Sequence, residues 1–266
     1  MTIFEPIQPE PAPDAQVWRY SPLWALLWAI EHRALHLTLL EELRRKHDPF
    51  EASVPKRIKD DDMVVCGSRS QFTDSYFFDD MAPAPVPSED NLTRLGRLRK
   101  GLLRSAHASS WRLGYESAPM WKLYCGVTDG VAIRSTFGEL RNSVGGDPDT
   151  VVSAVKYCDY QTERFTIHTQ NYHPALHKQR VFSMEEEVRV LRYREEDFNR
   201  AAADSAFALP PNWSLKWNPE DVIHRIVINP YCPPPYLPTA KAAIGRLSPV
   251  LADKVSPSDL SSDPLY

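Results

Sequence analysis

The chain has 266 residues with 31 basic against 35 acidic side chains, a formal net charge of −4 that is too weakly cationic for a general nucleic-acid coat. Its four cysteines are too few and too widely spaced for a disulfide scaffold, so we expect reduced thiols in a cytoplasmic protein. The most apolar run, residues 22–30, is shorter than the roughly 20 residues a membrane-spanning helix needs, and no signal peptide is recognisable. We therefore expect no membrane contact.

Periodicity, prolines and capping residues predict the elements in chain order. A Pro-rich arm over 1–16 precedes a strand at 17–20, a buried helix at 22–34, a strand at 34–38 and a polar helix at 41–46. Further helices are predicted at 88–106, 116–125 and 136–144, the last opened by a Thr-Phe-Gly-Glu capping box. Strands follow at 130–135, 151–160, 163–168, 186–194 and 222–228, then a closing helix at 239–252 and a loose tail at 253–266.

This order predicts one α+β domain over residues 17–252, with helices mainly in the first half and a mixed or antiparallel sheet mainly from the second. Residues 52–110 fit a variable insertion, irregular at 52–87. The helix at 88–106 has a basic face formed by Arg94, Arg97, Arg99, Lys100 and Arg104. Such a face is usually solvated, and the alternative is a contact surface for a protein or nucleic-acid target.

Several kinds of chemistry lack their motifs. The chain has no Gly-rich phosphate loop, no Gly-x-Ser-x-Gly nucleophile elbow and no His-Glu-x-x-His sequence. His168, His173 and His177 lie close together, but no carboxylate or cysteine completes a standard ligand spacing. We therefore expect no metal site.

Four segments carry a family resemblance. They are Trp18-Arg19-Tyr20; Asp48-Pro49-Phe50-Glu51; Ser110-Trp111 with 116–124 (Glu-Ser-Ala-Pro-Met-Trp-Lys-Leu-Tyr) and 130–136 (Gly-Val-Ala-Ile-Arg-Ser-Thr); and 156–160 (Lys-Tyr-Cys-Asp-Tyr) with Phe182, Glu185, Glu187, Val188 and Arg189. Over about residues 17–230 the chain resembles the bacterial family catalogued as domain of unknown function 2971. Ser110 departs from the family pattern, which has Cys before Trp, so a catalytic cysteine is not expected there. The resemblance implies a fold and characteristic residues, but no reaction.

The matched positions are mostly polar, charged or aromatic, which is not the composition of a core. They include Arg19, Asp48, Glu51, Glu116, Ser117, Trp121, Tyr124, Arg134, Ser135, Lys178, Glu185, Glu187 and Arg189. Buried together, such side chains must pair, and a dense paired network in a cleft is a candidate site.

The order of these residues also resembles, more distantly, the Arg-Ser-Glu layout of ADP-ribosyltransferase toxins that modify DNA. That resemblance assigns Arg19 and Thr38 to binding NAD as co-substrate and Glu185 and Glu187 to catalysis. Two glutamates spaced two apart on a strand point the same way, so one would hold the ribose and the other act as a general base. The rings of Tyr20, Trp121 and Tyr124 would stack on nicotinamide or adenine. This hypothesis, or the related NAD hydrolase, requires Arg19 and a glutamate in one cleft.

Three alternatives stay open. The run from Glu185 to Glu187 is also typical of solvated surface, with Arg19 and Glu187 as a structural ion pair. The chain is otherwise a non-enzymatic sensor or partner-binding domain of an anti-phage or toxin system, acting through the helix at 88–106. The last alternative is a metal-dependent nuclease built on Asp147, Asp149 and Glu187, although Arg189 stands where such sites use lysine.

Overall fold

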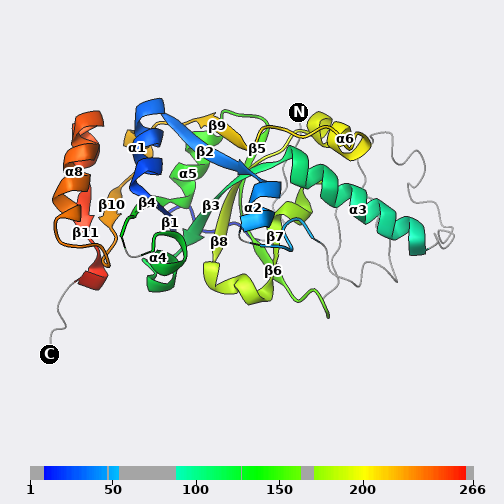
Figure 1. Ribbon diagram of the computed structural model, residues 1–266, viewed down its shortest axis with the longest axis horizontal. Helices are drawn as coiled ribbons and strands as arrows, with labels where there is room; N and C mark the ends of the chain where they lie inside the picture. Colours follow the sequence, from blue (N-terminus) through cyan, green and yellow to red (C-terminus); the bar gives the residue numbers. More distant parts are fainter. Residues whose placement is uncertain (1–8, 47, 54–87, 127, 163–170, 262–266) are drawn as a thin grey trace.

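The computed structural model describes residues 9–46, 48–53, 88–126, 128–162 and 171–261 (Figure 1). Its centre is a mixed, mostly antiparallel sheet, which confirms the predicted α+β class. The strands of this sheet are β1 (Gln16–Ser21), β2 (Ala34–Leu39), β3 (His107–Leu113), β4 (Val131–Thr136), β5 (Thr150–Ala154), β8 (Glu187–Arg192), β9 (Asn212–Lys216), β10 (Arg225–Ile228) and β11 (Val255–Pro257). A parallel pair, β6 (Lys156–Cys158) and β7 (His177–Gln179), lies apart from it.

β3 organises the sheet. One of its edges pairs with β8 along the whole stretch from His107 to Arg112. The other edge is shared, because β2 pairs with its start at His107 and Ala108 and β1 pairs with its end at Arg112 and Leu113. Beyond β1 the sheet continues with β4, β10 and β11, whereas beyond β2 it continues with β9. The sheet therefore splits between β1 and β2 (Figure 1).

Helices cover both faces of the sheet. The first face packs against α1 (Leu23–His32), α5 (Phe137–Val144), α7 (Pro219–Val222), α8 (Tyr236–Leu247) and α9 (Pro249–Asp253), and holds the largest apolar cluster. The second face is covered at one end by α2 (Leu40–Lys46), α3 (Ser88–Ser105), α6 (Glu195–Ala203) and the 3-10 turn η2 (His173–Leu176), and at the other by α4 (Ala118–Tyr124). Each end has its own apolar cluster, and polar side chains fill the stretch between them.

Strand alternation decides which side chains reach the second face. From β1, β3 and β8 they are Trp18, Tyr20, Ser110, Arg112, Glu187 and Arg189. The register agrees, since Trp18 lies opposite Arg112 and Arg112 lies opposite Glu187. Three neighbouring strands thus present a polar and aromatic patch to one place.

Most predicted elements are confirmed within a few residues, including β1, α1, β2, α2, α3, α4, β4, α5 and β8. The Thr136 hydroxyl accepts a hydrogen bond from the Glu139 amide, so the predicted N-cap is formed, and the Glu139 carboxylate accepts a hydrogen bond from that same hydroxyl. The sequence patterns do not predict β3, α6 or β9. The sequence of β3, His-Ala-Ser-Ser-Trp-Arg-Leu, shows no polar and apolar alternation because small and polar residues are buried on both of its faces.

Two boundary predictions need correction. Residues 107–110 belong to the central strand and α3 contributes Leu102 and Leu103 to the core, so 52–110 is not wholly an insertion; residues 54–87 lie outside the described ones. The end of the chain is not loose up to residue 261, because β11 pairs with β10 and is followed by the turn η4 (Asp259–Ser261). More of the strands come from the second half of the chain than from the first, as predicted. The strand predicted at 163–168 lies outside the described residues.

No helix in the described part of the chain is long and apolar enough to cross a membrane. The Pro-rich arm docks where it is described, since the Gly138 amide donates to the Pro13 carbonyl and the Phe137 amide donates to the Ala15 carbonyl. The first turn of α5 therefore anchors residues 13–15.

Replacing the cap of α5 tests this local structure. We expect Thr136→Ala to lower the free energy of unfolding by about 1 kcal/mol, because an orphan helix amide loses its acceptor. Urea denaturation followed by circular dichroism measures the change. Thr239→Ala serves as the control, since that exposed hydroxyl donates only to the Pro235 carbonyl inside α8. Equal effects of the two substitutions would show that the cap is unimportant.

Candidate functional site

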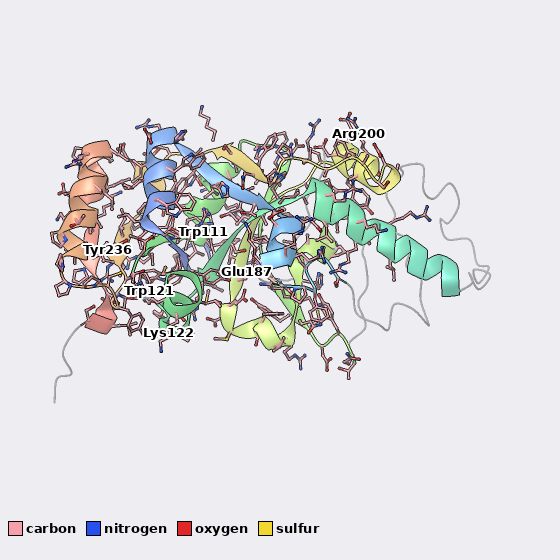
Figure 2. All side chains as sticks on the ribbon, viewed as in Figure 1. Trp111, Trp121, Lys122, Glu187, Arg200 and Tyr236 are labelled. Carbon is pink, nitrogen blue, oxygen red and sulfur yellow. The ribbon has the colours of Figure 1, made fainter. Side chains whose placement is uncertain are left out.

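Five charged side chains form a buried network on the second face, called here the charge cluster: Glu51, Lys178, Glu185, Glu187 and Arg189. The Arg189 guanidinium is at its centre. It donates from Nε to Glu187 Oε1 at 2.8 Å and from Nη1 to Glu51 Oε1 at 2.6 Å. Lys178 Nζ lies 3.0 Å from Glu187 and 2.7 Å from Glu185. Figure 2 shows Glu187 well inside the body, while Lys122 and Arg200 lie at its margin.

Glu51 reaches this cluster through a tight turn after α2. The Asp48 carboxylate accepts a hydrogen bond from the Phe50 amide at 2.8 Å, which closes the turn. Arg99 on α3 donates to the Pro49 and Glu51 carbonyls and holds the turn from outside. The residue after Glu51, Ala52, has φ +53°, a left-handed conformation that costs energy without glycine. The fold thus accepts local strain to aim Glu51 inward.

Glu185 and Glu187, the two candidate catalytic residues, lie close together, but not because they share a strand as the sequence predicts. Glu185 ends the 3-10 turn η3 (Arg180–Glu185), and Glu187 begins β8, so they do not share a strand. Glu186 between them has φ +41° and reverses the chain. That left-handed residue directs Glu185 and Glu187 to the same ammonium of Lys178. Glu186 itself points outward and pairs with Arg112.

The cluster holds three carboxylates against two cations, so one negative charge is in excess. Burial alone would raise the pKa of Glu187, but Arg189, Lys178 and the Ser110 hydroxyl outweigh it and hold that pKa below the ordinary value. For Glu185, burial raises the pKa more than Lys178 lowers it. Burial likewise raises the pKa of Glu51 despite its contact with Arg189. Neighbouring carboxylates with pKa values pushed apart are the arrangement that acid–base enzymes use.

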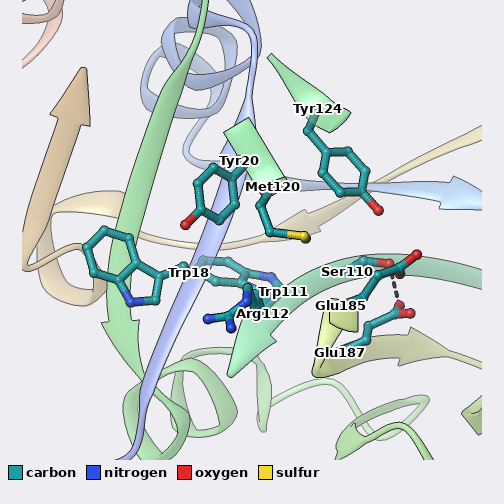
Figure 3. A pocket seen from close by; sticks show the side chains of 9 residues that line it. All are labelled: Trp18, Tyr20, Ser110, Trp111, Arg112, Met120, Tyr124, Glu185 and Glu187. Atoms are coloured by element: carbon teal, nitrogen blue, oxygen red, sulfur yellow. Dashed lines mark hydrogen bonds between the residues drawn. The ribbon is translucent and has the colours of Figure 1, made fainter. Parts of the chain in front are cut away.

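A small pocket opens against Glu185 and Glu187. Its lining also includes Trp18, Tyr20, Ser110, Trp111, Arg112, Met120 and Tyr124 (Figure 3). Ser110 Oγ donates to Glu187 Oε1 at 2.5 Å, and in Figure 3 the Tyr124 hydroxyl is directed toward this pair. The cavity measures about 30 Å³, the volume of one water molecule. Ser110, Glu185 and Glu187 give this pocket a polar floor, and Met120 and Tyr124 of α4 form its roof.

Aromatic hydroxyls around the pocket are kept neutral. Burial and the nearby Glu185 raise the pKa of Tyr124, and burial raises the pKa of Tyr20 to about 12. The Tyr20 hydroxyl accepts a hydrogen bond from the Ser117 amide at 2.7 Å, which ties β1 to the start of α4. Tyr157, buried nearby, accepts one from the Glu187 amide at 2.8 Å. These rings fix the walls and leave the carboxylates as the groups that exchange protons.

Arg19 is not in this site, which corrects the prediction based on the transferase layout. Trp18 and Tyr20 line the pocket, so strand alternation turns Arg19 to the opposite face. Its guanidinium donates to the His36 carbonyl on β2 at 3.3 Å and bridges the split in the sheet. Burial lowers the pKa of Arg19 to about 10. Arg19 holds two diverging strands together, and the predicted Arg19–Glu187 ion pair is not formed either.

The other predicted residues divide by position. Thr38 lies at the far end of β2, opposite Ala108 and Asn212, and does not line the pocket. Trp121 is fully buried behind the pocket, edge-on to Tyr20 at 4.9 Å between ring centroids, and its indole donates to Glu116. Ser135 lies on the first face. Glu116, Ser117 and Arg134 flank α4 on the second face beside the pocket.

The carboxylates of the predicted nuclease site are not brought together. Asp149 forms an ion pair with Arg194 and precedes Thr150, which lies opposite Arg192 at the C-terminal end of β8. Glu187 lies at the N-terminal end of β8, so the two carboxylates are at opposite ends of this strand. No group of three potential ligands that could hold a metal occurs among the described residues. The basic face of α3 is narrower than predicted, because Arg99 and Arg104 donate to carbonyls of the body. Arg97 and Lys100 are exposed, and the Arg94 side chain lies outside the described part.

Sequence reasoning missed several pocket residues. Ser110 was noted only as a departure from the family pattern, yet its hydroxyl contacts Glu187. Trp18, Arg112 and Met120 carry no chemical motif of their own. Only the unrecognised strand β3 reveals that Ser110 and Arg112 face β8. No family model, curated protein or solved structure matches the chain. The resemblance to domain of unknown function 2971 stays a prediction.

Replacing Arg189, the cation at the centre of the charge cluster, should strongly destabilise the fold. We expect Arg189→Met to lower the free energy of unfolding by about 3–5 kcal/mol, because Glu51 and Glu187 would be left as buried carboxylates with too few partners. Arg45→Met is the matched control: that exposed arginine forms only surface pairs, and its loss should cost less than about 1 kcal/mol. Guanidinium denaturation of both variants makes the comparison. A loss of under 1 kcal/mol for Arg189→Met would contradict the assigned role.

Acid should weaken the charge cluster through Glu187. A carboxyl whose pKa is lower in the folded than in the unfolded chain stabilises the fold above the unfolded value, about 4.3 for glutamate, and loses that stabilisation as the pH falls. Glu187→Gln lacks this titration, whereas Glu51 and Glu185 titrate in both proteins. We therefore expect the difference in unfolding free energy between wild type and variant to shrink from pH 6 to pH 3. A constant difference would refute the lowered pKa.

Proposed function

We propose that this protein is an enzyme that cleaves the N-glycosidic bond of a nucleotide such as NAD, using Glu187 and Glu185. One observation carries the proposal: two carboxylates, one with a lowered and one with a raised pKa, meet at a single ammonium beside an aromatic-lined pocket. Cleavage of such a bond passes through an oxocarbenium-like ribose that needs an ionised carboxylate beside it. It also needs a base for the incoming nucleophile.

The two glutamates have distinct roles in this proposal. Arg189, Lys178 and Ser110 keep Glu187 ionised, so its charge stabilises the cation that develops on the ribose. Glu185 has its pKa raised toward the working pH, which suits a general base. The bond from ribose to nicotinamide breaks with its electron pair leaving on nicotinamide. Water then adds to the ribose and gives its proton to Glu185; a target nucleophile in place of water gives ADP-ribosyl transfer.

The pocket must widen before a nucleotide enters, since its present volume suits one water molecule. The roof consists of Met120 and Tyr124 from α4, a helix whose N-cap residue, Ser117, makes no side-chain capping bond. Leu123 on the same helix is exposed, so α4 is held mainly from one side. In the proposal, outward movement of α4 admits the substrate, and Tyr124 then stacks on it.

NAD consumption tests the proposal. Purified protein would be incubated with labelled NAD, alone and with cell lysate, beside Glu187→Gln, Glu185→Gln and the exposed control Glu196→Gln. We expect at least a hundredfold lower rate for the two site variants and an unchanged rate for the control. Arg19→Gln should retain the rate, because Arg19 lies on the other face.

A function that depends on the exposed part of α3 and not on Glu187 would favour a partner-binding domain. If NAD is not consumed under either condition, the proposed enzyme is rejected. A pull-down from lysate would then compare wild type with an Arg97→Glu/Lys100→Glu variant of the exposed part of α3. Loss of a bound protein in that variant, with none in Glu187→Gln, is the result that assigns the function to α3.

A further inference from the structure

A row of side chains crosses the second face beside the pocket. Arg225 on β10 lies opposite Arg134 on β4, Arg134 lies opposite Trp18 on β1, and Trp18 lies opposite Arg112 on β3. Residues paired across neighbouring strands point to the same side of a sheet. The row ends at Glu187, which lies opposite Arg112. Two arginines of the outer strands are therefore aligned with the proposed catalytic carboxylate.

The neighbouring row explains why these arginines stay accessible. Tyr20, Ala132 and Val227 lie opposite one another and are covered by α4 in an apolar cluster. The arginine row is one step further along the strands, beyond that cover. Arg134 is only partly buried, and its guanidinium has no hydrogen-bond or ion-pair partner within the described residues. A cation beside a pocket whose hydrogen-bond donors are unused is a candidate for a ligand contact.

Residues 256–259 border this row at the β10 edge of the sheet. Arg225 donates to Ser256 Oγ at 2.7 Å, to the Pro257 carbonyl at 3.0 Å and to Asp259 Oδ1 at 2.8 Å. The Glu116 carboxylate, beside α4, accepts hydrogen bonds from the Ser258 hydroxyl and from the Asp259 amide. Polar contacts thus link the segment 256–259 to Arg225 on one side and to Glu116 on the other.

Asp259 holds the position that a bound anion would take. Hydrogen bonds from Arg225, joined by the charge of Arg134, keep the pKa of Asp259 below its usual range. Its side chain is nevertheless 71% exposed, so this ion pair is weak and exchangeable. A phosphate carries more charge than a carboxylate and accepts more hydrogen bonds from two arginines. It would displace Asp259.

We propose that Arg134 and Arg225 bind the diphosphate of an elongated nucleotide substrate, and that Asp259 of the C-terminal segment occupies this anion site until the substrate arrives. The inference rests on the proposed function, since it names the substrate class of the same pocket. Neighbouring strands lie about 4.8 Å apart, so β4 is about 14 Å from β8. That separation suits a dinucleotide whose phosphates lie away from the bond being cleaved. Asp259 thereby offsets part of the positive charge of the empty site and selects for phosphorylated ligands.

Calorimetric titration with inorganic pyrophosphate tests the anion site without any turnover. The proteins compared are wild type, Arg134→Gln, Asp259→Asn and the control Arg97→Gln, an exposed arginine of α3 at the other end of the molecule (Figure 1). We expect Arg134→Gln to bind roughly tenfold more weakly and Asp259→Asn several-fold more tightly, with no change in the control. Unchanged affinities in both site variants, with native circular dichroism spectra, would overturn the proposal.

Steady-state NAD kinetics on the same variants separates this inference from the proposed function. If pyrophosphate binding follows the expected pattern but NAD is not consumed, the anion site stands and the enzyme assignment fails. If NAD is consumed and its KM is the same in wild type, Arg134→Gln and Asp259→Asn, the enzyme assignment stands and the anion site fails. A higher KM for Arg134→Gln and a lower one for Asp259→Asn, at constant kcat, supports both.

Discussion

The guanidinium of Arg189 is the constraint around which the second face is built. It is 1% exposed and donates to Glu187, to Glu51 and to the Ala175 carbonyl, so it joins β8, the turn after α2 and the turn η2. A buried cation of this kind is tolerated only when every donor finds an acceptor. Its neighbours must therefore be placed with little freedom. The left-handed residues Ala52 and Glu186, which adjoin the glutamates of the cluster, show where the backbone accommodates that demand.

The charge cluster is also the feature on which the proposed reaction at the pocket depends. An apolar filling of the same space would be at least as stable, so three carboxylates and two cations are a costly way to build a core. Here Glu185, on the wall of the pocket, has its pKa raised by burial, while Glu187 is held ionised behind it. Lys178 contacts both carboxylates, so in our proposal it serves the stability of the fold and the reaction at once.

The split of the sheet at β3 explains why the side chains of one short sequence segment have two different roles. The segment Trp18-Arg19-Tyr20 sends its two rings to the pocket and its arginine to the gap between β1 and β2. In our proposal the phosphate is bound instead by Arg134 and Arg225, which lie on strands further out, next to residues 256–259. One strand thereby supports the sheet on one face and the pocket on the other.

The sequence by itself determined the α+β class and most of the helices and inner strands, and its list of candidate residues contained all five members of the charge cluster without separating them from residues such as Arg19 and Ser135. Those features follow from local patterns: a capping box at Thr136, alternation in β8, and polar residues too numerous to be surface. It did not reveal β3, whose residues are buried on both faces and so show no alternation, and with β3 it missed Ser110 and Arg112. Only the tertiary structure decided that Arg19 points away and that Glu185 and Glu187 converge. Strand pairing and one left-handed residue settle both, and neither has a signature in single-chain spacing.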